Sequence, residues 1–135
     1  MSLWITVALV ATLGCGLMSG LFFAFSTSVM RALARRPPRE AMAAMQEINR
    51  TILNPLFLTT FFLTAAACLV VAAGAATGHL GAGRRLLIAG GVLYLIGGFG
   101  VTVTCNVPRN RSLARSRVTG LRAPAVWSEF ETNWT

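Results

Sequence analysis

The sequence lacks lysine and aspartate, and charged residues make up only 12% of its 135 positions. Residues 1–30 and 86–108 contain no charged side chain, and residues 51–83 contain only His79 as a chargeable one. Soluble domains are about 25% charged, whereas a helix of about 20 apolar residues crosses the hydrocarbon core of a bilayer. The three uncharged stretches therefore exclude a soluble domain and indicate an integral membrane protein.

These stretches also lack the groups on which many membrane functions depend. Ion-coupled carriers, proton pumps and voltage sensors need ionisable residues within the membrane. Haem, copper and di-iron centres need several His, Met or carboxylate ligands, which one histidine in a loop cannot supply, so we predict no metal site. The cysteines Cys15, Cys68 and Cys105 lie in different stretches without a C-x-x-C pair, which favours buried thiols over a quinone-coupled disulfide relay.

The positive charge is carried by arginine alone, and the net charge is +8. Such a balance can indicate nucleic-acid binding, but here the arginines flank the apolar stretches, as they do in membrane proteins, so we predict no nucleic-acid partner. Ten of the twelve arginines lie between residues 31 and 50 or after residue 108, and only Arg84 and Arg85 lie in the other connection. The positive-inside rule then places the Arg-rich loops in the cytoplasm and Met1 outside, and we expect a bacterial plasma membrane.

The pattern predicts an all-α fold, a transmembrane helical bundle that forms a single membrane domain over residues 1–135. We expect three spans at residues 3–30, 55–76 and 86–107, and a short amphipathic helix at the membrane interface at residues 40–53. A basic, irregular tail is expected at residues 108–135, and its last stretch, residues 127–134, can start another helix. Prolines set these boundaries, because the residue before a proline avoids helical geometry. Pro37-Pro38 begins the amphipathic helix, Asn54-Pro55 begins the second span, and Pro108 ends the third.

Small residues suggest how the helices pack. Ala8, Thr12, Cys15 and Ser19 recur at helical spacing in the first span, where they overlap the pair Gly16-x-x-x-Gly20. Stripes of this kind let a second helix approach closely, so we expect packing on this face and a homo-oligomer formed through such faces. A glycine-rich turn is expected at residues 74–83.

Neutral polar residues gather toward the Arg-rich side. Tyr94, Gly98, Thr102 and Asn106 recur every four residues and share one helix face, and the other amides nearby are Asn49, Asn54 and Asn110. A buried amide costs free energy unless it is hydrogen-bonded. Two interpretations stay open: these amides cap helix ends and bridge the bundle, or they line a polar pocket.

The motifs resemble those of the anthrone-oxygenase-like family of small membrane proteins. The resemblance spans nearly the whole chain and rests on these segments: GLFFAFS at 20–26, VMRAL at 29–33, AMQEIN at 44–49, Asn54-Pro55, YLIGGFGVT at 94–102, NVPRN at 106–110, and Trp127 with Trp134-Thr135. It implies a four-span bundle, and some fungal members oxidise anthrones to anthraquinones. The family usually has an apolar residue where Arg109 stands. Its fourth span would begin where this sequence stops, so either the chain is truncated, which we expect, or this member lacks that helix.

The resemblance also implies a chemistry, in which a flat lipophilic aromatic substrate, anthrone- or quinol-like, reacts with O2 without a metal or another cofactor. Asn49, Asn106 and Asn110 are then the polar contacts for the substrate and its oxyanion, and Glu47 is the candidate base, with water as the alternative. Substrate binding falls to Tyr94, Thr102, Arg109 and Trp127. The rival hypothesis is a non-enzymatic membrane scaffold, small-molecule binder or complex subunit in which the amides are structural.

Overall fold

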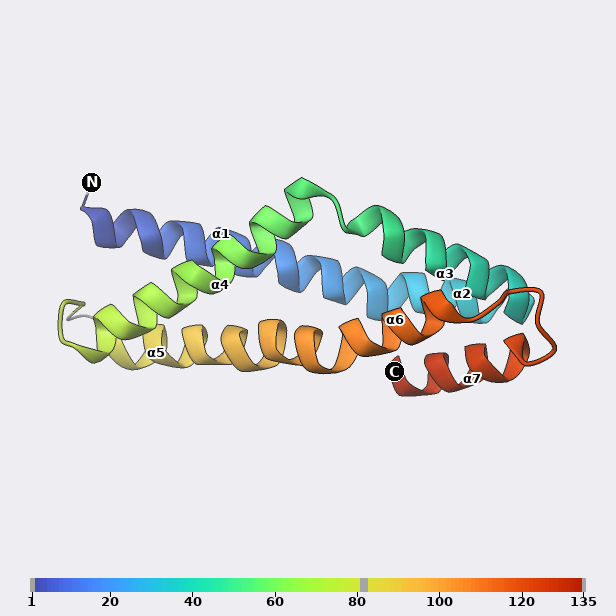
Figure 1. The fold of residues 1–135 in the computed structure, drawn as a ribbon. Helices are drawn as coiled ribbons and strands as arrows, with labels where there is room; N and C mark the ends of the chain where they lie inside the picture. The colour runs from blue at the N-terminus through green and yellow to red at the C-terminus, as the bar shows by residue number, and fades with distance from the viewer. Residues whose placement is uncertain (1, 81–82, 135) are drawn as a thin grey trace. The chain divides into compact units, whose positions relative to one another are not determined.

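The computed structural model describes residues 2–80 and 83–134, and this part of the chain is helical without a strand (Figure 1). Three of its helices, Leu3–Ala34, Pro55–Ala76 and Arg84–Arg115, are long and apolar enough to cross a membrane. The predicted all-α fold with three spans is therefore confirmed, and the protein is a membrane protein.

The first span is longer than the sequence suggested. It consists of α1 (Leu3–Ala24), a π-helical turn (Phe25–Val29) and α2 (Met30–Ala34). The expected end at Met30 is wrong by one helical turn, because an arginine such as Arg31 is a good helix former and does not stop a helix. The chain leaves helical geometry only next to the prolines, where Pro37 has an extended ψ of 136°.

The next two helices lie close to their expected positions. The amphipathic helix α3 covers Pro38–Ile52, and its first residue is a proline, whose missing N–H costs nothing in the first helical turn. The span α4 covers Pro55–Ala76. Between them, Asn54 donates a side-chain hydrogen bond to the Thr51 carbonyl at 3.1 Å, which closes the end of α3.

The third span continues past Pro108, where the sequence pattern had placed its end. It begins with α5 (Arg84–Leu93), passes through π-helical turns at Tyr94–Gly100 and Thr102–Asn106, and continues as α6 (Val107–Arg115). A proline inside a helix lacks an N–H and crowds the carbonyl four residues earlier. The π-helical turn just before Pro108 widens the helix and starts α6 afresh, so the proline stands in a first turn, where it is tolerated.

The C-terminal tail is also more ordered than expected. After a short connection, residues Ala123–Trp134 form the helix α7. Its buried residues Ala123, Trp127 and Phe130 recur every three or four positions, as an amphipathic helix requires. The description of the tail as irregular is therefore wrong for α6 and for the start of α7, because both helices present an apolar face on which they can pack. The helix expected over residues 127–134 lies within α7.

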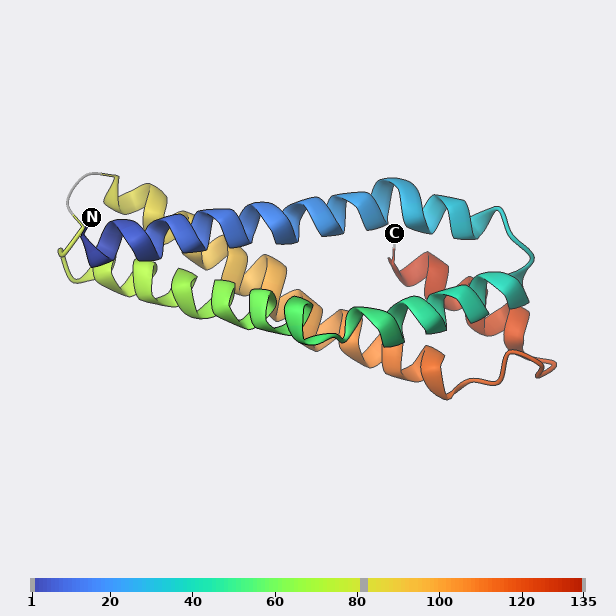
Figure 2. The ribbon, with the colours of Figure 1, turned by 90° about the horizontal axis from the view of Figure 1, so that it is seen from above.

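The chain folds as two compact units: unit 1 comprises Met1–Gly20 and Pro55–Thr102, and unit 2 comprises Leu21–Asn54 and Val103–Thr135. In unit 1, α4 packs against α5 (Figure 1) and lies beside the first part of α1 (Figure 2). A Cβ at Gly14 would collide with the Thr64 side chain, and one at Gly91 would come within 2.9 Å of the Cys68 carbonyl oxygen. Glycines thus hold α4 close to both neighbouring helices.

The packing face of α1 lies beside the predicted stripe and shares Cys15 with it, since the Cys15 thiol contacts Cys68 of α4. The buried residues of α1 are Ala11, Gly14 and Met18, whereas a Cβ at Gly16 or Gly20 would meet nothing within 4 Å. Spacing alone could not choose between two small-residue stripes, and the Thr64 side chain selects Gly14. Gly74, which was expected to open the glycine-rich turn, lies within α4. The Trp4 ring occupies the place that a Cβ at Gly74 would take.

Unit 2 has a core of its own. Helices α2, α3, α6 and α7 contribute Met30, Leu33, Ala41, Met42, Met45, Leu113, Ala123, Trp127 and Phe130. Gln46 joins α3 to the end of α6, because its Nε2 donates to the Leu113 carbonyl at 2.7 Å and to the Ser116 carbonyl at 2.9 Å. The Leu113 carbonyl also accepts the Ser116 backbone N–H, so Gln46 adds a second bond there and reaches the Ser116 carbonyl at the end of α6, where intrahelical donors run out.

A pair of glycine substitutions tests the packing of unit 1. Gly14→Ala should destabilise the protein by about 1–3 kcal/mol, because the added methyl overpacks the contact with Thr64. Gly16→Ala, two residues away on the open face, should be neutral or stabilising by up to about 1 kcal/mol, because alanine is the better helix former. Thermal unfolding in detergent measures both changes, and equal midpoints for the two variants would contradict this packing.

Candidate functional site

Asn49 lies on the buried side of α3. Met42 and Met45 precede it by seven and four residues on the same face, and both are fully buried in the core of unit 2. Within the part of the chain that the structure describes, the Nδ2 atom of Asn49 is buried without a hydrogen-bond partner. Such an orphan donor costs about 1–3 kcal/mol.

Asn110 occupies the matching place on α6. It lies three residues before the buried Leu113 and hence on the same face of the helix. Its Oδ1 atom is buried and, among the described residues, has no hydrogen-bond partner. The half-buried Asn106 lies one turn earlier. Since α3 and α6 contact each other, unit 2 brings a free amide donor and a free amide acceptor to two touching helices.

This arrangement distinguishes Asn49 and Asn110 from the other amides. Asn54 bonds to the Thr51 carbonyl, Asn133 donates to the Glu129 carbonyl at 2.8 Å, and Gln46 uses its Nε2 twice. The idea that amides close helix ends therefore accounts for Asn54 and Gln46 but not for Asn49 and Asn110. An unpaired N–H and an unpaired C=O can bind a ligand that carries both an acceptor and a donor.

Glu47, the candidate base, lies elsewhere on α3. Its carboxylate is 63% exposed and forms an ion pair with Arg50 at 3.0 Å. Residues two positions apart on a helix point about 200° away from each other, so Glu47 and Asn49 face opposite sides of α3. The structure thus brings Asn49 and Asn110 to buried faces and leaves Glu47 on an open one.

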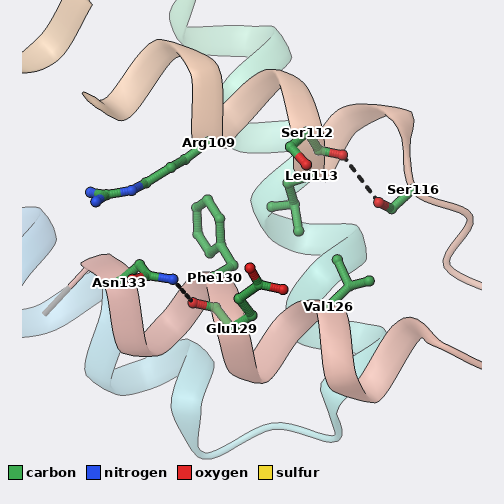
Figure 3. A pocket seen from close by; sticks show the side chains of 8 residues that line it. All are labelled: Arg109, Ser112, Leu113, Ser116, Val126, Glu129, Phe130 and Asn133. Atoms are coloured by element: carbon green, nitrogen blue, oxygen red, sulfur yellow. Dashed lines mark hydrogen bonds between the residues drawn. The ribbon is translucent and has the colours of Figure 1, made fainter. Parts of the chain in front are cut away.

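Arg109 borders a groove of about 130 Å³ between α6 and α7 (Figure 3). The groove is lined from α6 and its end by Arg109, Ser112, Leu113 and Ser116, and from α7 by Val126, Glu129, Phe130 and Asn133. It therefore combines a cation, a carboxylate and hydroxyls around the Phe130 ring. The sequence pattern did not single out Glu129 or Asn133. Their four-residue spacing in a segment that also holds buried aromatic residues was the signal available.

Trp127 is part of the core of unit 2. Only 3% of its surface is exposed, and its ring stacks on Phe130 with centroids 5.7 Å apart. Phe130 in turn stacks on Trp134, and Trp134 lies against Phe25 of the first span. This row of aromatic rings fixes α7 in place, so the contacts of Trp127 are those of a structural residue.

The two remaining residues of the predicted site belong to unit 1. Tyr94 is buried, and its hydroxyl donates to the Phe61 carbonyl at 3.4 Å. Thr102 donates to the Gly98 carbonyl one turn earlier at 2.7 Å. The Tyr94 hydroxyl thus bonds to the backbone of the second span, and the Thr102 hydroxyl bonds to the backbone of its own span. Among the described residues, no group of three or more His, Cys, Asp or Glu side chains is placed to hold a metal ion.

Comparison with known proteins identifies one family. The family model described as anthrone oxygenase matches residues 47–135, which include α4, α5, α6 and α7 and the two orphan amides. No curated protein and no solved structure matches the chain.

Replacement of Trp127 separates a structural from a ligand-binding role. Trp127→Ala should destabilise unit 2 by about 3–5 kcal/mol, because it leaves a cavity in the core. Leu121→Ala is the control: Leu121 is 95% exposed, and such a surface change stays within about 0.5 kcal/mol. Chemical unfolding in detergent micelles gives both values. An unchanged unfolding midpoint for Trp127→Ala would favour a role in ligand contact.

Proposed function

This chain belongs to the anthrone oxygenase family, and we propose that it oxidises a flat, lipophilic anthrone- or quinol-like substrate with O2 as co-substrate. The reaction proceeds without a bound metal or organic cofactor. It takes place at the polar side chains of unit 2, which lie on the cytoplasmic side if the Arg-rich loops follow the positive-inside rule. The bilayer supplies the substrate, because an aromatic of this kind dissolves in lipid.

The pair of orphan amide atoms is the observation that carries this proposal. Asn49 Nδ2 and Asn110 Oδ1 are buried and unpaired among the described residues, although polar groups elsewhere in the bundle find partners. A hydroxylated aromatic ketone presents one carbonyl oxygen and one hydroxyl, which complement a free N–H and a free C=O. Binding such a ligand removes the cost of both orphan atoms, which the free protein bears.

The reaction that these contacts support converts a methylene group to a ketone. The CH2 between the aromatic rings of an anthrone is acidic, because its anion is delocalised onto the carbonyl oxygen opposite. This electron-rich anion transfers electrons to O2 directly. Over the whole reaction the carbon loses both hydrogens and gains one oxygen atom from O2, and the second oxygen atom leaves as water.

Asn49 stabilises the charge that develops on the carbonyl oxygen when the first proton leaves. A preorganised N–H aimed at a developing oxyanion in a dry site is worth more than the same bond in water. Asn110 accepts a hydrogen bond from the substrate hydroxyl and fixes its orientation. Asn106, one turn before Asn110, and the cation Arg109, which follows on the same helix, add further polar contacts.

Water takes the proton in this scheme. Glu47 is paired with Arg50 on the exposed side of α3, opposite the side that carries Asn49, and it is poorly placed to reach a substrate held by that amide. The amide oxygen of Asn110 is too weak a base. The acidity of the substrate makes a strong base unnecessary, so the task of the protein is to stabilise the anion.

Substitution of the two asparagines by leucine, which has nearly the same shape, tests the proposal. Asn49→Leu should lower kcat for conversion of an anthrone to the anthraquinone by roughly 10²–10³-fold, as loss of one oxyanion donor does. Asn110→Leu should mainly raise KM. Neither variant should be less stable, because each loses a buried unsatisfied atom, and a gain of about 1 kcal/mol is expected. Product absorbance, O2 consumption and thermal unfolding provide the measurements.

Thr132→Ala is the control, because Thr132 is an exposed polar residue of unit 2 that donates to the Ser128 carbonyl of its own helix and lies outside the groove bordered by Arg109. Its turnover should equal that of the wild type. If Asn49→Leu and Asn110→Leu lose stability and activity in the same proportion, the amides are structural, and the scaffold hypothesis gains. A stable wild-type protein that consumes no O2 with any anthrone would exclude the oxygenase.

Glu47→Gln separates the two candidate bases. Removal of an exposed carboxylate that does not reach the substrate should leave kcat within about two-fold of the wild type and stability within about 0.5 kcal/mol. A loss of 10²-fold or more in kcat would identify Glu47 as the general base.

A further inference from the structure

Unit 1 contains a pair of thiols in contact, although the spacing of the cysteines in the sequence favoured separate buried thiols over a quinone-coupled disulfide relay. Cys15 of α1 and Cys68 of α4 are 53 positions apart, yet their Sγ atoms lie 3.5 Å from each other. A disulfide bond has an S–S distance of about 2.05 Å and needs Cα atoms no more than roughly 7 Å apart. Two neighbouring helices meet that condition only where their backbones come very close.

Helices α1 and α4 come into close contact beside this pair. Gly14, which precedes Cys15, has no room for a Cβ because the Thr64 side chain occupies its place. Thr64 lies one helical turn before Cys68 and hence on the same face of α4. The thiols therefore lie next to the closest approach of α1 and α4. The two sulfur atoms are already in contact at 3.5 Å, and a disulfide requires them to approach each other by about 1.5 Å.

The other side of Cys68 is also held. A Cβ at Gly91 of α5 would lie 2.9 Å from the Cys68 carbonyl oxygen, so α4 makes one glycine contact with α1 and another with α5. Only 3% of the Cys68 surface is exposed, whereas Cys15 is half-buried. An oxidant from outside the bundle thus reaches Cys15 first, and Cys68 is the second, sheltered thiol.

The position along the spans selects the class of oxidant. Cys15 is twelve residues from the start of the span Leu3–Ala34, and Cys68 is eight residues from the end of Pro55–Ala76. At about 1.5 Å per residue, both lie more than roughly 10 Å inside a helix end. Water-soluble disulfides do not enter the hydrocarbon layer, but quinones dissolve in it and accept two electrons.

We propose that Cys15 and Cys68 form a redox pair that closes to a disulfide across α1 and α4, with a lipid-soluble quinone as the oxidant. The Cys15 sulfur adds to the quinone ring. The Cys68 sulfur then attacks Cys15 Sγ, so that the S–S bond forms and the C–S bond breaks with its electron pair on the ring. The two thiol protons end on the two oxygens of the quinol.

This pair is separate from the proposed oxygenase site, because all its residues belong to unit 1. It also differs from Cys105, whose Sγ lies 3.6 Å from the Thr104 hydroxyl. The Cys105→Ser variant therefore lacks the third thiol, and its two remaining thiols are those of Cys15 and Cys68.

The test uses the Cys105→Ser chain in lipid nanodiscs, treated with duroquinone, whose methyl groups suppress permanent ring adducts. Thiols are then counted with a polyethylene-glycol maleimide after denaturation, and intact mass is measured. Both thiols should be lost, the mass should fall by two hydrogen atoms, and dithiothreitol should restore both values. Persistence of two free thiols, or a disulfide-linked dimer, would overturn the proposal.

Three further variants in the Cys105→Ser background serve as controls. Cys15→Ser and Cys68→Ser should each show no loss of two hydrogen atoms. The third moves the first thiol to the opposite face of α1 by combining Leu13→Cys with Cys15→Ser, since Leu13 is 69% exposed. This variant should form no intramolecular disulfide. If it closes as readily as the native pair, collision and not the packed geometry governs the reaction, and the proposal fails.

Discussion

The absence of water from the hydrocarbon core is the constraint on which the rest of this structure depends. Each unpaired backbone group costs several kcal/mol there, so the chain must stay helical through each span. Even Pro108 does not interrupt the third span, which absorbs the proline with a π-helical turn. The hydroxyls obey the same rule, since Thr12, Thr60 and Thr64 each donate to the carbonyl one turn earlier.

Against this background, two unsatisfied amides are informative. Gln46 and Asn49 lie on the same helix, three residues apart, yet Gln46 makes two hydrogen bonds and the Asn49 donor makes none within the described residues. Folding alone gains nothing from such an atom, and an apolar side chain of the same shape would be more stable. A buried polar atom without a partner requires an explanation, and a ligand that pairs with both atoms supplies one, which is why Asn49 and Asn110 carry the functional proposal.

The two units have different chemistries. Unit 2 holds all four glutamates and ten of the twelve arginines, and its amides suit a substrate that develops negative charge. Unit 1 holds the thiol pair among apolar side chains and glycine contacts. Both proposed reactions draw a flat, lipid-soluble reactant from the bilayer, and neither requires residues of the other unit.

The uncharged stretches determined the membrane location, the three spans and the all-α fold, because a helix that is long and apolar enough can cross the hydrocarbon core whatever its detailed sequence. Proline positions located α3 and the start of α4 but misplaced the end of the third span, since whether a helix passes a proline depends on the turn before it. The sequence also identified Asn49 and Asn110 as candidate site residues, but it could not show that their amides are unpaired. Only the tertiary structure decided three features: the unpaired amides, the choice of Gly14 over Gly16 as the packing residue, and the contact between Cys15 and Cys68. Each depends on a side chain from a distant part of the chain.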